Sequence, residues 1–318
     1  MAQRSVRGLE HSRLIAPANG DSASTNFEGE DAAAPGGGRP LACPACGRTM
    51  RHHFLYVSNG CDILRCEACG LGRAEANSFD PDSYYTGDYF SGKHADGYAD
   101  YQGAERTLRR EFAQTVQFIR KFASSGRLLD VGCAYGFFLQ EAKPFFDVAG
   151  IELAQDAADH CRRSGLNVLT GAAEPECLRR LGSFDVITLL DVIEHLPSPV
   201  ETVATLVQHL NPGGILVVTT GDFGALSARL AGARWRLMTP PQHLWFFSQE
   251  SMRRMMTRLG FRLEHLDHPW KLVPLSLITF QFARMAGWSP HRVPAWGGLG
   301  VPVNLYDAMR VVLRKPRS

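Results

Sequence analysis

The sequence predicts an α/β fold built on a doubly wound parallel sheet, with a small cysteine-rich module in front of it. From residue 105 onward, short apolar runs typical of buried strands alternate with segments whose apolar residues recur every three or four positions, as in helices. This alternation indicates a parallel sheet with helices on both faces. Two Cys-x-x-Cys pairs, at 43–46 and 66–69, predict the separate module.

The composition is that of an ordinary globular enzyme. The 318 residues are 45% apolar and 21% charged, with a net charge of +2, so nucleic acid is not expected as a partner on charge alone. An uncharged apolar run of about 18 residues, the length needed to span a bilayer, is missing from the sequence. The first 20 residues also lack the apolar core of a signal peptide, so we expect a cytoplasmic protein.

Changes in composition divide the chain into four segments. Residues 1–40 are rich in Ala, Gly, Ser and Asp, which predicts a disordered tail. Residues 41–75 hold the cysteine pairs. Residues 76–104 are polar, Gly-rich and unusually rich in tyrosine, as expected of a connector, and the α/β domain occupies residues 105–318.

The α/β domain opens with a helix, because Leu108, Phe112, Val116 and Ile119 are spaced by four, four and three residues and so share one face. Further helices are predicted from residue 137, at 155–165, at 198–210 and at 249–259. Short apolar runs predict strands at 127–132, 147–153, 167–171, 184–190, 214–220, 261–268 and 307–315.

The stretch LLDVGCAYGFFL indicates a nucleotide-type cofactor. A buried strand ends in Asp130, and Gly132 and Gly136 allow a tight turn into a helix whose free amides face a ligand. About 20 residues later Glu152 closes the next strand, where a carboxylate can accept both ribose hydroxyls of an adenosine ligand. A dinucleotide-dependent oxidoreductase is the alternative, but it would prefer Gly-x-Gly-x-x-Gly, and Ala134 replaces the middle glycine.

In order and spacing, the segments LDVGCAYG, GIEL, FDVITLLDVIEHL and LNPGGILVVTT resemble the class I S-adenosylmethionine methyltransferases over roughly residues 105–220. The segment HLWFFSQESMRRMMTRLGF resembles one branch of that family. The resemblance implies a Rossmann-like sheet, S-adenosylmethionine as cofactor, and methyl transfer as the activity. It also implies which residues contact the cofactor. The methionine portion would be contacted by Asp130, Gly132, Ala134 and Gly136, and the ribose by Glu152. Ala172 and Ala173 would lie near the adenine, and Leu190 and Asp191, at the end of the fourth strand, would face the cofactor. The family often has an acidic residue near the adenine, where this chain reads GAAE.

The two cysteine pairs, CPACG and CEACG, are separated by 19 residues. Four thiolates in this spacing suit tetrahedral zinc in a closed, structural site, with the ligands Cys43, Cys46, Cys66 and Cys69. Four unliganded core cysteines are the alternative. Cys61 is interpreted as a packed thiol, and Cys133 as a small buried side chain.

The order of ribbon, tyrosine-rich connector and methyltransferase domain resembles the sugar C-methyltransferases that act on nucleotide-linked deoxysugars. This implies a small-molecule acceptor, a sugar or sugar-derived intermediate, methylated at carbon or oxygen. One alternative is a methyltransferase for RNA or protein with the ribbon as reader, although the balanced charge speaks against RNA. The other is a non-catalytic ribbon module, against which the intact Gly132, Gly136 and Glu152 speak.

Methyl transfer needs a base only if the acceptor must lose a proton. His243 lies in an irregular segment after the fifth strand, on the edge where ligands of such sheets bind, and is the first candidate base. Its alternative role is to cap the next helix or to pack against Trp245. The other candidates are His195 and the connector tyrosines, which either close over the cofactor or pack the ribbon onto the domain: Tyr84, Tyr85, Tyr89, Tyr98 and Tyr101.

In DVIEHL, the spacing of Asp191, Glu194 and His195 would place the three side chains on one face of a helical turn. The run resembles one in some quinone-pathway O-methyltransferases that binds a divalent metal. The alternative is a loop–helix junction beside the cofactor.

Residues 271–300 begin with a strongly apolar stretch that Lys271, Pro274 and Arg284 interrupt, so it is too short to span a bilayer. We interpret it as an insertion that caps the acceptor pocket or forms a dimer contact. With a lipid-linked sugar as acceptor, peripheral contact with a membrane surface is the alternative.

Overall fold

The computed structural model describes residues 38–76, 101–275, 279 and 300–317, all within one compact unit that comprises residues 38–318. The tyrosine-rich connector, apart from Ala76 and residues 101–104, lies outside the described residues, as do residues 1–37 of the segment interpreted as a tail. None of the described helices is long and apolar enough to cross a membrane.

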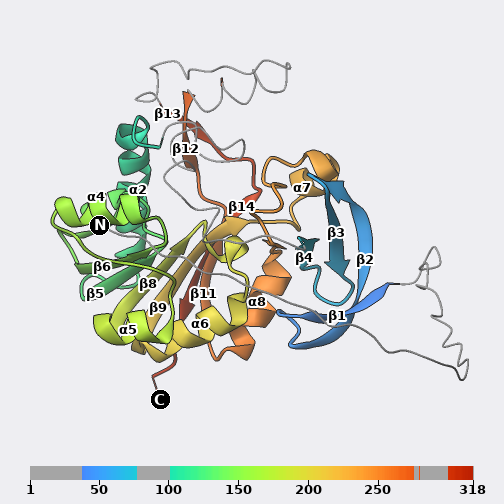
Figure 1. Ribbon diagram of the computed structural model, residues 1–318, viewed down its shortest axis with the longest axis horizontal. Helices are drawn as coiled ribbons and strands as arrows, with labels where there is room; N and C mark the ends of the chain where they lie inside the picture. Colours follow the sequence, from blue (N-terminus) through green and yellow to red (C-terminus); the bar gives the residue numbers. More distant parts are fainter. Residues whose placement is uncertain (1–37, 77–100, 276–278, 280–299, 318) are drawn as a thin grey trace, which may run out of the picture. The chain divides into compact units, whose positions relative to one another are not determined.

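The main element is a seven-stranded sheet with the order β11-β14-β9-β8-β5-β6-β7 (Figure 1). Its strands are β5 (Arg127–Val131), β6 (Asp147–Glu152), β7 (Asn167–Thr170), β8 (Phe184–Leu190), β9 (Leu210–Gly221), β11 (Arg262–Asp267) and β14 (Ala308–Arg314). Strands β7, β6, β5, β8 and β9 pair in parallel, each with its neighbour. This confirms the doubly wound, Rossmann-like fold.

Strand β14 is the exception, because it pairs antiparallel with both β9 and β11. The sheet is therefore mixed, and the expectation of an all-parallel sheet was wrong for this strand. A parallel return needs a crossover, usually a helix, on one face of the sheet. The connection from β11 to β14 instead includes a hairpin of two short strands, β12 (Lys271–Pro274) and β13 (Gly300–Val303), at the ends of the predicted insertion.

Helices cover both faces of this sheet. One hydrophobic cluster joins one face to α2 (Glu105–Ile119), α3 (Phe137–Ala142) and α4 (Gln155–Arg163). A second joins the other face to α5 (Pro175–Leu181), α6 (Pro199–Gln208) and α8 (Gln249–Arg258). Strand residues alternate between the two clusters, as Leu216 and Val217 of β9 do, because successive side chains of a strand point to opposite faces.

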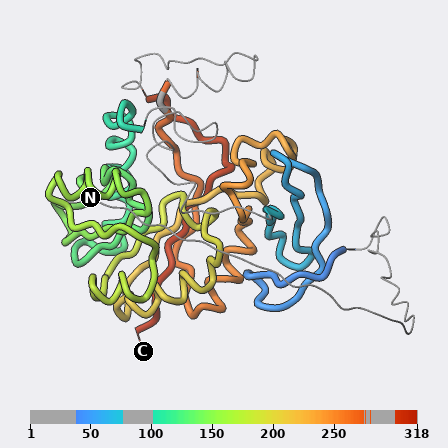
Figure 2. The backbone as a smooth tube through the Cα atoms, in the orientation of Figure 1, coloured from blue at the N-terminus to red at the C-terminus, as the bar shows by residue number. Residues whose placement is uncertain are grey.

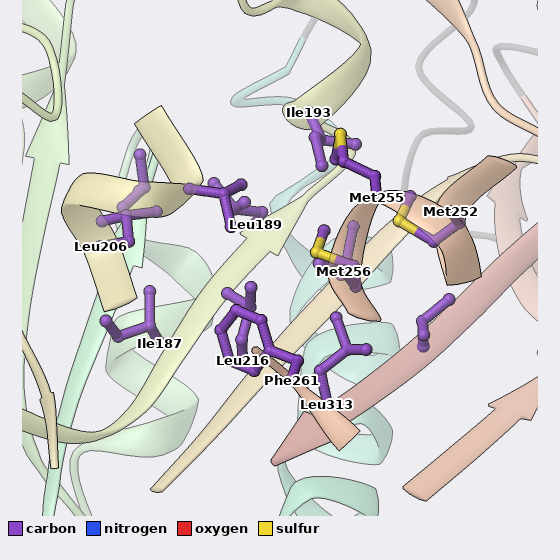
Figure 3. Close-up of a cluster of buried hydrophobic side chains, with 14 of the residues drawn as sticks. Ile187, Leu189, Ile193, Leu206, Leu216, Met252, Met255, Met256, Phe261 and Leu313 are labelled. Carbon is purple, nitrogen blue, oxygen red and sulfur yellow. The ribbon is translucent and has the colours of Figure 1, made fainter. Parts of the chain in front are cut away.

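Helix α8 shows why the second face is tightly packed. Met252, Met255 and Met256 are fully buried in the same hydrophobic cluster as Ile193, Phe261 and Leu313 (Figure 3). Their spacing of three and four places them on one side of the helix, and burial of each such side chain stabilises the fold by about 1.5–3 kcal/mol. A capping box between Ser248 and Ser251 begins the helix.

The cysteine module forms a second sheet, with the order β1-β2-β3-β4-β10. Its strands are β1 (Arg39–Cys43), β2 (Arg48–Ser58), β3 (Cys61–Cys66), β4 (Gly72–Glu75) and β10 (Trp245–Phe246). Strand β10 comes from the far end of the chain and pairs with β4, so the blue strands lie beside the orange segment in Figure 2. Strand β1 starts two residues inside the segment interpreted as a tail, because Arg39 and Pro40 pair with β2.

Candidate functional site

The turn between β5 and α3 requires glycine at two positions. Gly132 and Gly136 have φ of 75° and 76°, in the left-handed region that side chains disfavour. A Cβ at Gly132 would also lie 2.7 Å from Val192 Cγ2, and one at Gly136 would lie 2.6 Å from Leu166 Cδ1. The turn is therefore held close to the end of β8 on one side and to α4 on the other.

Glu152 holds this turn from the end of β6. Its side chain is buried, and its two oxygens accept hydrogen bonds from the backbone N–H of Ala134 at 2.8 Å and of Ala154 at 2.9 Å. Burial raises the pKa of Glu152, although these two bonds favour the ionised form. Each carboxylate oxygen has a second acceptor position, so Glu152 can also receive the hydroxyls of a ribose.

Asp130 is buried next to this turn and accepts a hydrogen bond of 2.6 Å from Thr188 Oγ1. Burial raises the pKa of Asp130 to about 7. The turn that contains Ala172 and Ala173 follows β7 and is joined to Glu152 by a backbone bond of 2.9 Å from Gly171 N.

All the residues predicted to contact the cofactor lie at the carboxyl ends of four neighbouring parallel strands, β7, β6, β5 and β8. That edge is where open α/β sheets bind their ligands. The set comprises Asp130, Gly132, Ala134, Gly136, Glu152, Ala172, Ala173, Leu190 and Asp191. Their side-chain chemistry fits S-adenosylmethionine, because a carboxylate stands where a ribose would bind and a glycine turn where the methionine portion would lie.

Asp191 makes contacts that local sequence does not reveal. It is a non-glycine residue with φ of 56°, and its side chain accepts a hydrogen bond from Thr219 Oγ1 at 3.0 Å and pairs with Lys271 Nζ at 2.7 Å. Desolvation opposes the ionised form, but the Lys271 ammonium holds the pKa of Asp191 below its usual value. Strained backbone of this kind is concentrated at functional sites.

Beside Asp191, the side chains of Glu194, His195 and His243 meet, with one ligand atom of each within 4.8 Å of the others. His195 Nδ1 lies 2.9 Å from Gln242 O, and His243 Nδ1 lies 2.8 Å from Leu237 O. A carbonyl oxygen only accepts, so each Nδ1 carries the proton and each Nε2 keeps a lone pair. Metal-binding histidines show this arrangement, with the second ring nitrogen bound to a backbone carbonyl.

Burial sets the charge of this cluster. It lowers the pKa of His195 to about 4 and, together with the nearby His195, lowers that of His243 to about 3. Burial and the proximity of Asp191 raise the pKa of Glu194 to about 8. Glu194 Oε2 is buried without a hydrogen-bond partner among the residues that the structure describes. Two neutral imidazoles and one carboxylate form a ligand set for a divalent transition metal, so the residues fit such an ion.

The structure separates Asp191 from the other two side chains of this run. The expectation that Asp191, Glu194 and His195 share a helical face fails, because the 3-10 helix η1 (Ile193–His195) begins after Asp191 and the Asp191 carboxylate turns to Lys271. His243, which lies far along the chain, is the side chain that meets Glu194 and His195. The loop before β10 carries it there, held by a bond of 2.9 Å from Leu244 N to Glu194 O.

Of the connector tyrosines, only Tyr101 lies within the described residues, whereas Tyr84, Tyr85, Tyr89 and Tyr98 lie outside them. Tyr101 is buried and stacks on Phe137, with ring centroids 5.5 Å apart and planes 8° apart. It therefore packs on the helix that follows the cofactor turn.

The four paired cysteines converge at one point. Cys43 Sγ lies 3.5 Å from Cys69 Sγ, Cys46 Sγ lies 3.9 Å from Cys66 Sγ, and all four lie within 4.8 Å of one another. A tetrahedron with Zn–S bonds of about 2.3 Å has sulfur–sulfur edges of about 3.8 Å, so the cluster fits zinc. Cys61 is apart from this cluster, buried near Ile63 and Phe246, and Cys133 is buried within the cofactor turn.

Helix α8 joins the cysteine turns to the main sheet. Ser248 Oγ donates to Cys69 O at 3.2 Å at the start of the helix, and Arg258 Nη1 donates to Pro44 O at 2.7 Å at its end. The ribbon is thus bound at both ends of a helix whose other face is part of the hydrophobic core.

A family model described as a methyltransferase domain matches residues 104–266, about half of the chain. The chain is 34% identical over 162 residues to a ubiquinone biosynthesis O-methyltransferase of Methylococcus capsulatus, covering 48% of this chain and 68% of the relative. It is 35% identical over 130 residues to the same enzyme of Nitrosococcus oceani, covering 38% of this chain and 55% of that relative. A solved S-adenosylmethionine-dependent methyltransferase from Archaeoglobus fulgidus is 19% identical, with a TM-score of 0.46 over 71% of this chain and 98% of that chain.

The chain therefore belongs to the methyltransferase-domain family, in the class of S-adenosylmethionine-dependent methyltransferases with a Rossmann-like sheet. The curated relatives are O-methyltransferases and not the sugar C-methyltransferases that the sequence resembled. The cysteine ribbon and the hairpin β12–β13 both lie outside the residues that the family model matches.

Proposed function

We propose that this protein transfers a methyl group from S-adenosylmethionine to a hydroxyl oxygen of a small aromatic acceptor, which a divalent metal at Glu194, His195 and His243 helps to bind. The observation that carries the proposal is the meeting of two imidazole lone pairs and a carboxylate at the end of β8. The relatives support oxygen as the methylated atom, because they are named O-methyltransferases of ubiquinone biosynthesis, and quinones carry oxygen on a six-membered carbon ring.

S-adenosylmethionine, when bound, supplies an electrophilic methyl group on a sulfonium sulfur. Glu152 would bind the ribose, Asp130 and the turn from Gly132 to Gly136 the methionine portion, and the turn at Ala172 the adenine. These contacts would direct the methyl group toward the end of β8. Alignment of an acceptor with that group supplies a large part of the catalysis in a displacement of this kind.

A metal at Glu194, His195 and His243 would supply positive charge that favours the ionised form of an acceptor hydroxyl. The two histidines are prepared for this role because burial keeps them neutral, and only a neutral imidazole can bind a metal. Glu194 would complete the ligand set as an ionised carboxylate.

The cysteine cluster has a different role in this proposal. Four thiolates leave a zinc ion no open position, so zinc at Cys43, Cys46, Cys66 and Cys69 would be structural. It would join the turn after β1 to the turn after β3, and helix α8 contacts both turns. We infer that residues 41–75 form a zinc ribbon that supports the methyltransferase domain at 105–318.

The test is metal binding and methyl transfer by the full-length protein. Wild type should bind one Mn²⁺ ion in addition to its zinc, measured by electron paramagnetic resonance, and should methylate 3,4-dihydroxybenzoate in a Mn²⁺-dependent way. His243→Ala should lose both. His209→Ala is the matched control. His209 also directs Nδ1 to a backbone carbonyl, Gly182 O at 2.9 Å, but it lies directly before β9 and is not part of the cluster at Glu194. Full activity of wild-type protein freed of all metal except zinc would contradict the metal assignment.

A sugar acceptor is the second candidate, and the four-cysteine ribbon favours it. The family model does not account for the ribbon, since its match begins at residue 104. Nucleotide-linked deoxysugars and dihydroxybenzoates should therefore be compared as acceptors with labelled S-adenosylmethionine. Mass spectrometry of the product then distinguishes an aromatic methyl ether from a sugar with a new carbon–carbon bond.

A further inference from the structure

A second pair of a histidine and a carboxylate lies at the same edge of the sheet. Asp222 directly follows β9, and its side chain is 1% exposed. His268 directly follows β11, is 20% exposed, and its Nε2 lies 3.1 Å from Asp222 Oδ2. Neither residue stands out in the sequence, and the methyltransferase motifs do not include them.

The carboxylate of Asp222 is held rigidly. Its Oδ2 also accepts a hydrogen bond from Gln249 Nε2 at 2.8 Å, and its Oδ1 accepts one from Gly224 N at 2.9 Å. The Asp222 backbone N–H donates to Asp307 O at 2.8 Å. A carboxylate fixed in this way sets the orientation and the tautomer of the imidazole that donates to it.

The imidazole of His268 is thereby left with one unused nitrogen. Nε2–H donates to Asp222, so Nδ1 carries the lone pair. Nδ1 has no hydrogen-bond partner in the part of the chain that the structure describes. Asn304 Nδ2 donates to the backbone oxygen of His268 at 2.9 Å, which holds the residue in place without using the ring.

Asp222 and His268 follow the ends of β9 and β11, at the edge of the sheet where the acceptor is proposed to bind. Thr219 Oγ1, two residues before the end of β9, donates to Asp191 at 3.0 Å. His268 directly precedes Pro269, Trp270 and Lys271, which line a pocket together with Asp191 and Thr219. An acceptor in that pocket would lie beside the segment that carries His268.

We propose that His268 is the general base that takes the proton of the acceptor hydroxyl, with Asp222 as the residue that positions it. This assignment rests on the proposed O-methyl transfer. The acceptor O–H bond breaks and its proton moves to His268 Nδ1, while the oxygen bonds to the methyl carbon and the bond from that carbon to sulfur breaks. S-adenosylhomocysteine leaves as a neutral thioether, and the imidazolium beside Asp222 later gives its proton to water.

The other two histidines at this edge are less suited to the task. His195 and His243 belong to the cluster with Glu194 that the proposed function assigns to a metal. Their lone pairs also face each other and Glu194, as metal ligands would.

The test is methyl transfer to 3,4-dihydroxybenzoate by His268→Ala, with and without added imidazole. We expect kcat to fall by about 100-fold or more, the worth of a positioned base, with unchanged KM for the acceptor and unchanged affinity for S-adenosylhomocysteine. Added imidazole should restore much of the rate, which it cannot do for a merely structural histidine. Asp222→Asn should also lower kcat, and imidazole should not rescue it.

His265→Ala is the matched control. His265 lies on β11, with Nε2 3.6 Å from Asp267 Oδ2, but its ring packs on Phe118 and Phe122 and not at the strand ends. Equal turnover of His268→Ala and His265→Ala, or a loss in His268→Ala that imidazole does not restore, would overturn the assignment. A wild-type protein without turnover on any hydroxylated acceptor would instead overturn the proposed function, and this assignment with it.

Discussion

The ammonium of Lys271 lies 2.7 Å from the carboxylate of Asp191, and this contact joins the hairpin β12–β13 to the edge of the sheet where the cofactor should bind. Leu272 N donates to Glu111 Oε2 at 3.1 Å, so the same hairpin is also bound to helix α2. Residues from three distant parts of the chain thus meet beside the end of β8.

We predict that Lys271→Met destabilises the protein by about 0.2–1 kcal/mol, a modest effect because the Asp191 side chain is 44% exposed. The folded protein holds the pKa of Asp191 below its ordinary value. The pair therefore stabilises the fold fully at a pH above the ordinary pKa of an aspartate, and this stabilisation is lost as the pH falls through the lowered pKa of the folded protein. Urea denaturation of wild type and variant should therefore differ at neutral pH and converge in acid. Lys271→Arg, which keeps the charge, should remain close to wild type throughout.

Glu152→Ala should weaken the binding of S-adenosylhomocysteine by about 1–3 kcal/mol, roughly 5- to 150-fold, because the ribose hydroxyls lose a charged acceptor. The backbone N–H groups of Ala134 and Ala154 would also lose the carboxylate that accepts their hydrogen bonds. Isothermal titration calorimetry measures the effect, and the exposed Glu174, on the turn near the adenine, provides the control Glu174→Ala. Unchanged affinity in Glu152→Ala would refute the ribose assignment, and tight binding of a nicotinamide dinucleotide would contradict the cofactor.

Cys66→Ser should lose the metal of the cysteine cluster, measured by elemental analysis of protein purified without added metal. The thermal midpoint should fall with it, because a structural zinc site contributes directly to folding. Cys61→Ser is the control, because Cys61 is a buried thiol at the other end of the same strand, outside the four-cysteine cluster. Its sulfur contacts the backbone oxygen of Asn59 at 3.9 Å. That control should keep one zinc, and retention of a full equivalent by Cys66→Ser would show the ligand set to be wrong.

Gly136→Ala should be more destabilising than Gly165→Ala, although both glycines have similar backbone angles, with φ of 76° and 72°. An alanine in this region costs about 1–2 kcal/mol from its backbone alone. Only at Gly136 would the new Cβ also collide with neighbours, Leu166 Cδ1 at 2.6 Å and Cys161 Sγ at 2.8 Å. Denaturant unfolding gives the difference, and similar losses in the two variants would contradict the tight packing of the turn.

Local patterns in the sequence predicted much of the fold, because strands, helices and tight turns depend on residues close together in the chain. The spacing of Gly132 and Gly136 predicted the turn after β5, and the paired cysteines predicted the four-sulfur cluster. The direction of β14 was not predictable in this way. Its apolar run is that of any buried strand, whereas its direction depends on how the connection from β11 returns.

By itself, then, the sequence determined the doubly wound fold, the position of the cofactor turn and the candidate ligands of a zinc site, since each rests on short-range spacing. Only the tertiary structure decided which polar side chains meet at the edge of the sheet. Asp191 meets Lys271 from 80 residues away, and Asp222 meets His268 from 46 residues away. No periodic pattern links such partners, because they come together only when separate strands and loops end at the same edge, and burial there then sets their charge.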